Sequence, residues 1–165
     1  GTADQLRSQL LPGRSRQRGV VTRLAQSIVT IELPLPPSVN KAFASAGNTH
    51  LVRRTESYRF WQRQVRDEHG AGATLPVLAP GEYGLLIELP GAMRGDSDNR
   101  TKLLSDILKP KTKEAHGLGI VRDDKLMRPH YVDFDDALPA GRVRLRIVTL
   151  VWWRPYLMSY LEGWA

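Results

Sequence analysis

Hydrophobic and polar residues alternate most regularly near the C-terminal end of the chain. Over residues 142–150, arginines alternate with branched aliphatic residues, and this period of two predicts a β-strand with one buried face. Residues 28–33 are rich in β-branched side chains and stop at Pro34, which predicts a second strand. Residues 83–89 are almost entirely apolar, so we expect a third strand that is covered on both faces.

Two segments have the apolar spacing of helices. Residues 55–69 form the first, and residues 100–109 form the second, which ends before Pro110. In each helix the apolar residues share one side. They are Tyr58, Trp61 and Val65 in the first helix, and Leu103, Leu104, Ile107 and Leu108 in the second.

The order of these elements predicts an α+β fold. Residues 120–127 and 131–134 are shorter strand candidates, whereas residues 70–81 and 111–119 have the composition of loops. We therefore expect a mixed sheet of about four or five strands, with the two main helices packed on one face.

The chain divides into three parts. Residues 28–152 form the expected folded domain, and residues 1–27 precede it with five arginines against one aspartate. This basic segment, with a possible short helix at residues 6–11, is either a DNA-contacting arm or a remnant of expression or of a misassigned start. Residues 153–165 form an aromatic tail. In it Tyr156, Tyr160 and Trp164 have the spacing of one helical face, which favours packing on the core or on a dimer partner over stacking on bases.

Composition narrows the function classes. The 165 residues include no cysteine, which excludes a disulfide scaffold, a thiolate zinc site and a cysteine nucleophile. No apolar run approaches the roughly 18 residues of a membrane span, and the N-terminal residues lack a secretory pattern, so we expect a soluble cytoplasmic protein. A formal net charge of +7 favours a polyanionic partner, although a basic surface also keeps proteins soluble.

The candidate chemistry lies around the second helix. Asp96 and Asp98 are two residues apart, so in extended backbone their carboxylates point to one side and can bind a hard divalent cation such as Mg²⁺. Lys102 follows one helical turn later, within reach of a phosphate at such a metal. The doublet Asp123-Asp124, on an expected strand, can direct one further carboxylate to the site.

Other interpretations of these acids remain open or are excluded. Asp98 or Asn99 can cap the helix while Asp96 shapes a turn. A calcium loop starting at Asp96 is excluded, because its sixth and twelfth positions lack the required glycine and glutamate. Asp106 shares the face of Asp98 and Lys102, and we expect it to hydrogen-bond Lys102 or to be solvated rather than to bind metal.

Three separated motifs resemble those of the RusA-type Holliday junction resolvases. The first is the acidic signature from Asp96 through Lys102 and Asp106 to Asp123-Asp124. The second is the run Leu33-Pro34-Leu35-Pro36-Pro37-Ser38-Val39-Asn40, and the third is Glu56-x-Tyr58-Arg59-x-Trp61. The similarity covers roughly residues 28–150, with the motifs in the family's order.

The resemblance implies a RusA-like fold and a homodimer that hydrolyses phosphodiesters in four-way DNA junctions during recombination and repair. It implies that Asp96, Asp98 and Asp124 bind Mg²⁺, or Mn²⁺ in its place, and that Lys102 is needed for cleavage. Two departures from the family pattern are the weakly basic segment before Asp96 and a long, lysine-rich spacer at residues 110–119.

Several basic residues are candidates for DNA contacts. One set is the three arginines that alternate along residues 142–146. The other set is on the first expected helix and consists of Arg59, Arg63 and Arg66. The residues that we expect to contact DNA are Arg59, Arg63, Arg94, Lys109, Lys111 and Lys113. The four histidines have no zinc-like spacing, so we assign them no ligand role.

Two other functions compete with junction resolution. One is a non-catalytic junction-binding accessory protein, against which the three crowded acids argue, because their mutual repulsion calls for a cation. The other is a metal-dependent nuclease for flaps or other branched DNA, which only a panel of substrates distinguishes from a resolvase.

Overall fold

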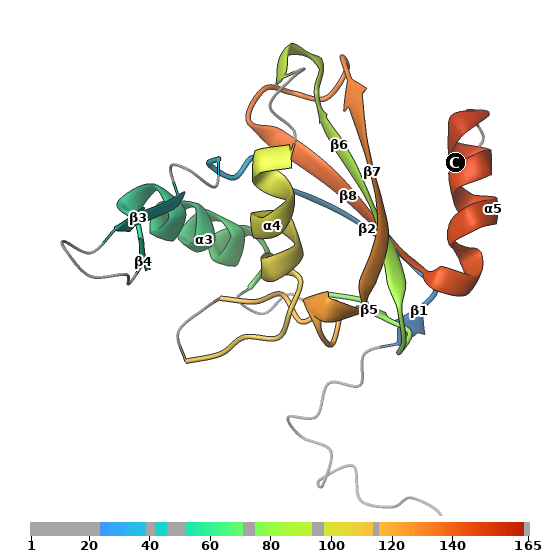
Figure 1. Cartoon of the computed structure of the whole chain (residues 1–165), viewed down its shortest axis with the longest axis horizontal. Helices are drawn as coiled ribbons and strands as arrows, with labels where there is room; N and C mark the ends of the chain where they lie inside the picture. The colour runs from blue at the N-terminus through green and yellow to red at the C-terminus, as the bar shows by residue number, and fades with distance from the viewer. Residues whose placement is uncertain are drawn as a thin grey trace, which may run out of the picture.

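A four-stranded mixed sheet forms the centre of the molecule (Figure 1). The computed structural model describes residues 24–38, 42–45, 52–70, 75–93, 98–113 and 116–163. The strand order is β2 (Ile28–Pro34), β8 (Arg142–Thr149), β6 (Tyr83–Pro90) and β7 (Met127–Asp135). β8 is antiparallel to both of its neighbours, whereas β6 and β7 run parallel.

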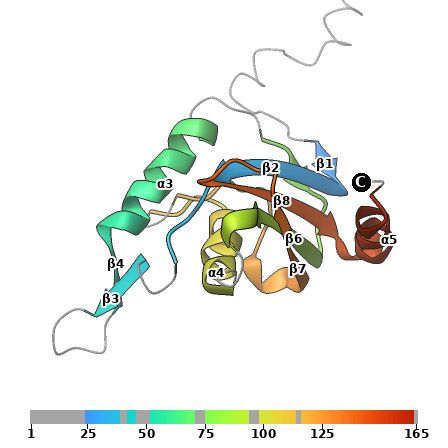
Figure 2. The same ribbon diagram turned by 90° about the horizontal axis from the view of Figure 1, so that it is seen from above.

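Helices cover both faces of this sheet. In Figure 2, α3 (Glu56–His69) and α4 (Asp98–Ile107) lie to one side, and α5 (Leu150–Leu161) lies to the other. The chain therefore has the expected α+β fold with a mixed sheet. None of the helices in the described part of the chain is both long and apolar enough to cross a bilayer.

Short elements complete the fold. The strands β1 (Ala25–Gln26) and β5 (Val77–Leu78) pair in parallel, and β3 (Phe43–Ser45) pairs with β4 (Val52–Arg54) in a small antiparallel ribbon. Two 3₁₀ turns, η2 (Gly91–Met93) and η3 (Asp124–Leu126), flank the region of α4. The predicted strand over residues 120–127 is wrong, because this segment is a turn followed by η3.

The main core lies between the sheet and the pair α3 and α4. Alternate residues of β2, β6 and β8 point into it, together with the apolar sides of both helices. Trp61 is buried there, and its indole Nε1 donates a hydrogen bond to the carbonyl of Pro34 at 2.8 Å. Arg100 Nε donates similarly to the carbonyl of Pro36 at 3.0 Å. These two bonds tie both helices to the proline-rich segment that follows β2.

A second, smaller core lies on the opposite face under α5. Trp153 packs there with Leu86 and Val148, and it occupies the space over Gly84. A β-carbon at Gly84 would lie 2.1 Å from the indole ring, so only glycine permits this close approach. Tyr156 and Tyr160 of the aromatic stripe pack against the same cluster, whereas Trp164 lies outside the described residues.

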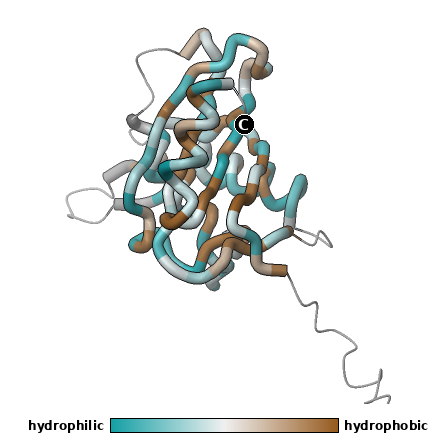
Figure 3. The backbone as a smooth tube through the Cα atoms, turned by 90° about the vertical axis from the view of Figure 1, so that its right-hand side faces the viewer, coloured by the Kyte–Doolittle hydropathy of each residue, from teal (hydrophilic) through white to brown (hydrophobic). Residues whose placement is uncertain are grey.

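The outward side of α5 is also apolar. Val151 and Trp152 are 79% and 53% exposed, and Met158 and Leu161 are exposed as well. Figure 3 views the molecule from this side. Because apolar residues surround the helix, its aromatic stripe is the only part of the pattern that indicates which side packs on the sheet.

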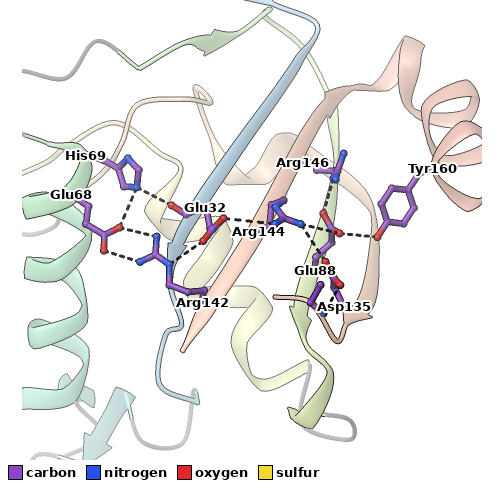
Figure 4. Close-up of polar contacts among 10 residues, drawn as sticks. Glu32, Glu68, His69, Glu88, Asp135, Arg142, Arg144, Arg146 and Tyr160 are labelled. Carbon is purple, nitrogen blue, oxygen red and sulfur yellow. Dashed lines mark hydrogen bonds and ion pairs between the residues drawn. The ribbon is translucent and has the colours of Figure 1, made fainter. Parts of the chain in front are cut away.

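The arginines of β8 form a charge ladder on the α5 face (Figure 4). Arg142 pairs with Glu32 and Glu68, Arg144 pairs with Glu32, Glu88 and Asp135, and Arg146 Nε lies 2.7 Å from Glu88. Tyr160 donates to Glu88, whose side chain is 5% exposed. These arginines are thus paired with acids of β2, β6, β7 and α3, which argues against a role in tracking DNA phosphates.

Candidate functional site

The C-terminal end of α4 is covered by the segment that follows it. The backbone N–H groups of Leu118 and Ile120 donate to the carbonyls of Ile107 and Leu108, at 2.8 and 2.9 Å. They satisfy carbonyls that a helix end otherwise leaves without partners. A β-carbon at Gly117 would lie 2.0 Å from the carbonyl oxygen of Lys109, so this return of the chain requires glycine there. The return brings η3 alongside α4.

The acidic doublet at η3 is placed by capping rather than by strand alternation. Asp123 is the N-cap residue, and its side chain accepts a hydrogen bond from the N–H of Lys125 at 3.0 Å. Asp124 is the first residue of the turn. Its carboxylate is directed toward α4, where it meets Asp106. The expectation that one acid of the doublet reaches the site from a strand is therefore wrong about the element.

Asp106 and Asp124 form a carboxylate pair. Lys109 lies between them, with its Nζ 3.5 Å from Asp106 Oδ1 and 3.6 Å from Asp124 Oδ1. Partial burial and the hydrogen bond to Asp124 raise the pKa of Asp106. Burial alone would raise the pKa of Asp124 too, but interactions with the side chains of Asp106 and Asp123 and the charge of Lys109 lower it. The two carboxyl groups therefore interact directly, and proton binding by one depends on the other.

The charges of the same acids also act on the buried hydroxyl of Tyr83. Burial raises the pKa of Tyr83, and the charges of Asp124, Asp123 and Asp106 raise it further. Within the described residues this hydroxyl has no hydrogen-bond partner. The three acids around α4 and η3 therefore act together on this buried hydroxyl.

Asp106 lines a hollow of about 400 Å³, which we call the carboxylate pocket. Its other charged lining residues are Arg54, Lys109, Arg122 and Asp123, and His116 borders it as well. The pocket thus joins acids to a cationic rim. This combination suits a ligand that is anionic but carries a cation, such as a metal-bound phosphate.

A second hollow of about 460 Å³ adjoins the first. Its lining, which we call the arginine cleft, consists of Arg54, Arg59, Gln62, Arg63, Arg66 and His116. Arg54 and His116 border both hollows, so the arginine cleft and the carboxylate pocket are neighbours. Burial lowers the pKa of His116, and the charges of Arg66, Lys111 and Arg54 lower it further. The imidazole is therefore neutral in a strongly positive field.

The structure places the predicted site residues in different positions. Asp96 and Arg94 lie outside the described residues, and of Asp98 only the backbone at the start of α4 is described. Asp98 precedes Asp106 by eight residues, so the two lie about 12 Å apart along the helix axis. Asp124 contacts Asp106, and it is therefore near the end of α4 that is opposite to Asp98.

The predicted basic residues also differ in their surroundings. Lys102 Nζ lies 5.3 Å from the ring centroid of Phe43, a cation–π contact, and not beside Asp106. Lys109 is engaged by the carboxylate pair. Arg59 and Arg63 line the arginine cleft as DNA contacts would, and Lys111 and Lys113 are exposed in the spacer.

The donor set fits a hard divalent cation in part. Asp106 and Asp124 supply carboxylate oxygens from two elements, and Mg²⁺ is commonly held by one or two carboxylates, water and substrate phosphate. Within the residues that the structure describes, no three acidic or histidine side chains gather into a group that could hold a metal. The two described carboxylates would thus need further ligands from water or phosphate.

Sequence reasoning missed three contributors to this region. Arg54 ends a short strand and carried no signal, and His116 was set aside because it has no zinc-like partner. Asp106 was expected beside Lys102, yet it bonds Asp124. Its position on the Asp98 face of the helix was the available signal.

Comparisons with known proteins add no assignment: no protein-family model matches the chain, and no curated protein does either.

Proposed function

We propose that this protein is a metal-dependent, structure-specific endonuclease that resolves four-way DNA junctions, as its resemblance to the RusA-type resolvases implies. One observation carries the proposal: Asp106, which contacts Asp124, lines a pocket that shares two lining residues with an arginine cleft. Phosphodiester hydrolysis needs both parts. Cations must hold the strand, and acids must bind the metal at the bond that breaks.

Each part of the site has a role in this scheme. Asp106 and Asp124 would hold Mg²⁺ together with water and substrate phosphate, because Asp98 begins α4 about 12 Å away from Asp106 along the helix axis. When bound, Mg²⁺ supplies charge neutralisation of the phosphoryl oxygens and lowers the pKa of coordinated water. The arginine cleft orients the strand so that one phosphate lies at the carboxylate pair. Lys109, at 3.5 to 3.6 Å from both carboxylates, offsets charge that develops on this phosphate.

The contact between the two carboxyl groups supports a functional interpretation of the pair. Two carboxylates in contact repel each other when both are ionised, and folding must oppose this repulsion. A divalent cation bound by both would remove this cost. A homodimer follows from the proposed substrate, since paired symmetric incisions need two sites related by a two-fold axis.

The test is cleavage of a four-way junction and of a matched linear duplex, with and without Mg²⁺. We expect paired nicks in the junction only with the metal, and none in the duplex. Asp124→Asn should lower the cleavage rate by at least about 100-fold while junction binding stays within a few-fold. Glu82→Gln is the control, because this exposed carboxylate pairs with Arg128 outside the carboxylate pocket and the variant should keep activity. Retained metal-dependent cleavage by Asp124→Asn would refute the proposal.

A second candidate is a junction-binding protein without catalysis. Lys109 favours it, because its ammonium already lies where a metal would neutralise both carboxylates. If Asp106, Asp124 and Lys109 form only a structural ion-pair network, the protein should bind the junction equally with or without Mg²⁺ and leave it uncut. Cleavage of flaps in preference to four-way junctions would instead identify a nuclease for other branched DNA.

A further inference from the structure

A third hollow opens beside the arginine cleft, and its walls are apolar. Its volume is about 290 Å³, near the lower end of the range for small-molecule sites. Val65 of α3, Ile107 of α4 and Leu118 form the apolar lining. Arg66, Lys111 and His116 complete it with polar groups.

This apolar pocket adjoins the arginine cleft. Arg66 and His116 belong to the lining of both. His116 also borders the carboxylate pocket, so all three hollows share this residue. A ligand that reaches from one hollow to the next would combine an apolar part with anionic groups.

A nucleotide has this division of chemistry. Its phosphates suit the arginines, whereas its base is a planar ring that stacks on aromatic or guanidinium groups and excludes water from apolar walls. His116 and Arg66 are both stacking platforms of this kind. Duplex DNA keeps its bases paired and stacked, so only a nucleotide that has left the stack can enter such a pocket.

We infer that the pocket formed by Val65, Ile107, Leu118, Arg66, Lys111 and His116 receives one unpaired base of the branched DNA, next to the phosphate at the carboxylate pair. The inference rests on the proposed function, because it takes the arginine cleft as the path of the strand. The pocket would favour branched over linear DNA, since unpairing a base costs least at a branch point. It would also give each incision a base preference.

The test is a cycle of substrates and variants, measured without metal so that binding is separate from cleavage. The probes are four-way junctions in which each nucleotide flanking the crossover is replaced, one at a time, by an abasic nucleotide. For the wild-type protein, we expect one position per cleaved strand at which the missing base weakens binding by roughly five- to a hundredfold.

The variant arm assigns that base to the pocket. His116→Ala removes a stacking surface from a partly exposed residue and should reduce the abasic effect to less than about threefold. Lys111→Ala, at an exposed residue of the same lining, should weaken binding of intact and abasic junctions equally. His130→Ala on β7, at an exposed histidine outside the pocket lining, is the control and should leave the abasic effect unchanged.

Two results would overturn the inference. One is equal affinity for intact and abasic junctions at every flanking position, and the other is an abasic effect of the same size in His116→Ala. Adding Mg²⁺ to the same samples separates the two proposals. Cleavage without an abasic effect leaves the endonuclease and removes the base pocket, and an abasic effect without cleavage does the reverse.

Discussion

Two regions of the molecule bring arginines and carboxylates together, and they use these charges differently. In the charge ladder on the α5 face, Arg146 lies 2.7 Å from Glu88, a carboxylate that is 5% exposed. Along the arginine cleft, the pair Arg59–Glu56 is 3.6 Å long, with side chains 55% and 82% exposed. Buried, matched charges stabilise one conformation, whereas solvated cations around a hollow remain available to an anionic ligand. The position of an arginine in the fold, and not its place in a sequence pattern, separates the two uses.

The largest effect on stability should come from the ladder. Arg146→Ala leaves Glu88 buried without its closest cation, so the free energy of unfolding should fall by about 3 kcal/mol. Arg63→Ala in the arginine cleft should change it by less than about 0.5 kcal/mol. Urea denaturation of both variants measures the difference. Equal losses would show that the two regions are alike and would break the comparison.

The close packing of α5 gives the next effect. Gly84→Ala places a methyl group against the indole of Trp153, and the helix must shift to accept it. We expect a loss of about 2 kcal/mol in the free energy of unfolding and a change in tryptophan fluorescence. Gly81→Ala is a useful contrast, because a β-carbon there meets nothing within 4 Å and only the positive φ of 118° opposes it.

DNA binding should depend on the cleft and not on the ladder. Arg63→Ala should weaken junction affinity about three- to tenfold and lower the slope of log affinity against log salt by about one. The control is Arg128→Ala on β7, an exposed arginine paired with Glu82 and outside the cleft lining. Equal effects in both variants would indicate binding by net charge alone.

The smallest effect concerns the carboxylate pair and pH. Because the folded-state pKa of Asp106 is raised, the folded protein binds more protons than the unfolded chain just above the ordinary aspartate pKa. Its contribution to stability therefore falls as pH rises through the window between the ordinary and raised values. The pKa of Asp124 is lowered, so its contribution to stability falls as the pH drops below the ordinary aspartate pKa.

Asp106→Asn removes this loss of stability at rising pH. The variant should therefore raise the free energy of unfolding at pH 7 by about 0.5 kcal/mol in the absence of divalent metal. Thermal unfolding between pH 4 and about 7 checks the sign, since the gain should grow with pH. A loss of stability at pH 7 would mean that Asp106, Asp124 and Lys109 form a structural ion-pair network.

Local patterns predicted the elements whose burial is one-sided or complete. The alternation in β8, the apolar run in β6 and the stripe of α3 all specify which face meets the core. The helix α5 was indicated only by the spacing of its aromatic residues, and its start at Leu150 was not predicted, because its apolar residues face both Leu86 and the exterior. Residues 120–127 resemble a strand by composition, but the hydrogen bonds of Leu118 and Ile120 to the end of α4 determine a turn instead.

The candidate site was also predictable only in part, because its contacts join residues that are distant in sequence. Asp124 could be chosen from its residue type, but its contact with Asp106 depends on how the chain returns to α4. The arginines of β8 looked like phosphate contacts because their acidic partners come from β2, β6, β7 and α3, which are distant in sequence. Charges that pair across strands leave no local signal.

The most direct measurement is Mn²⁺ binding to the free protein, followed by electron paramagnetic resonance of the unbound ion. The account predicts a Mn²⁺ site in the wild-type protein and in Glu82→Gln, and at least about tenfold weaker binding in both Asp106→Asn and Asp124→Asn. Equal Mn²⁺ affinity in all four proteins would contradict the claim that these two carboxylates form a metal site.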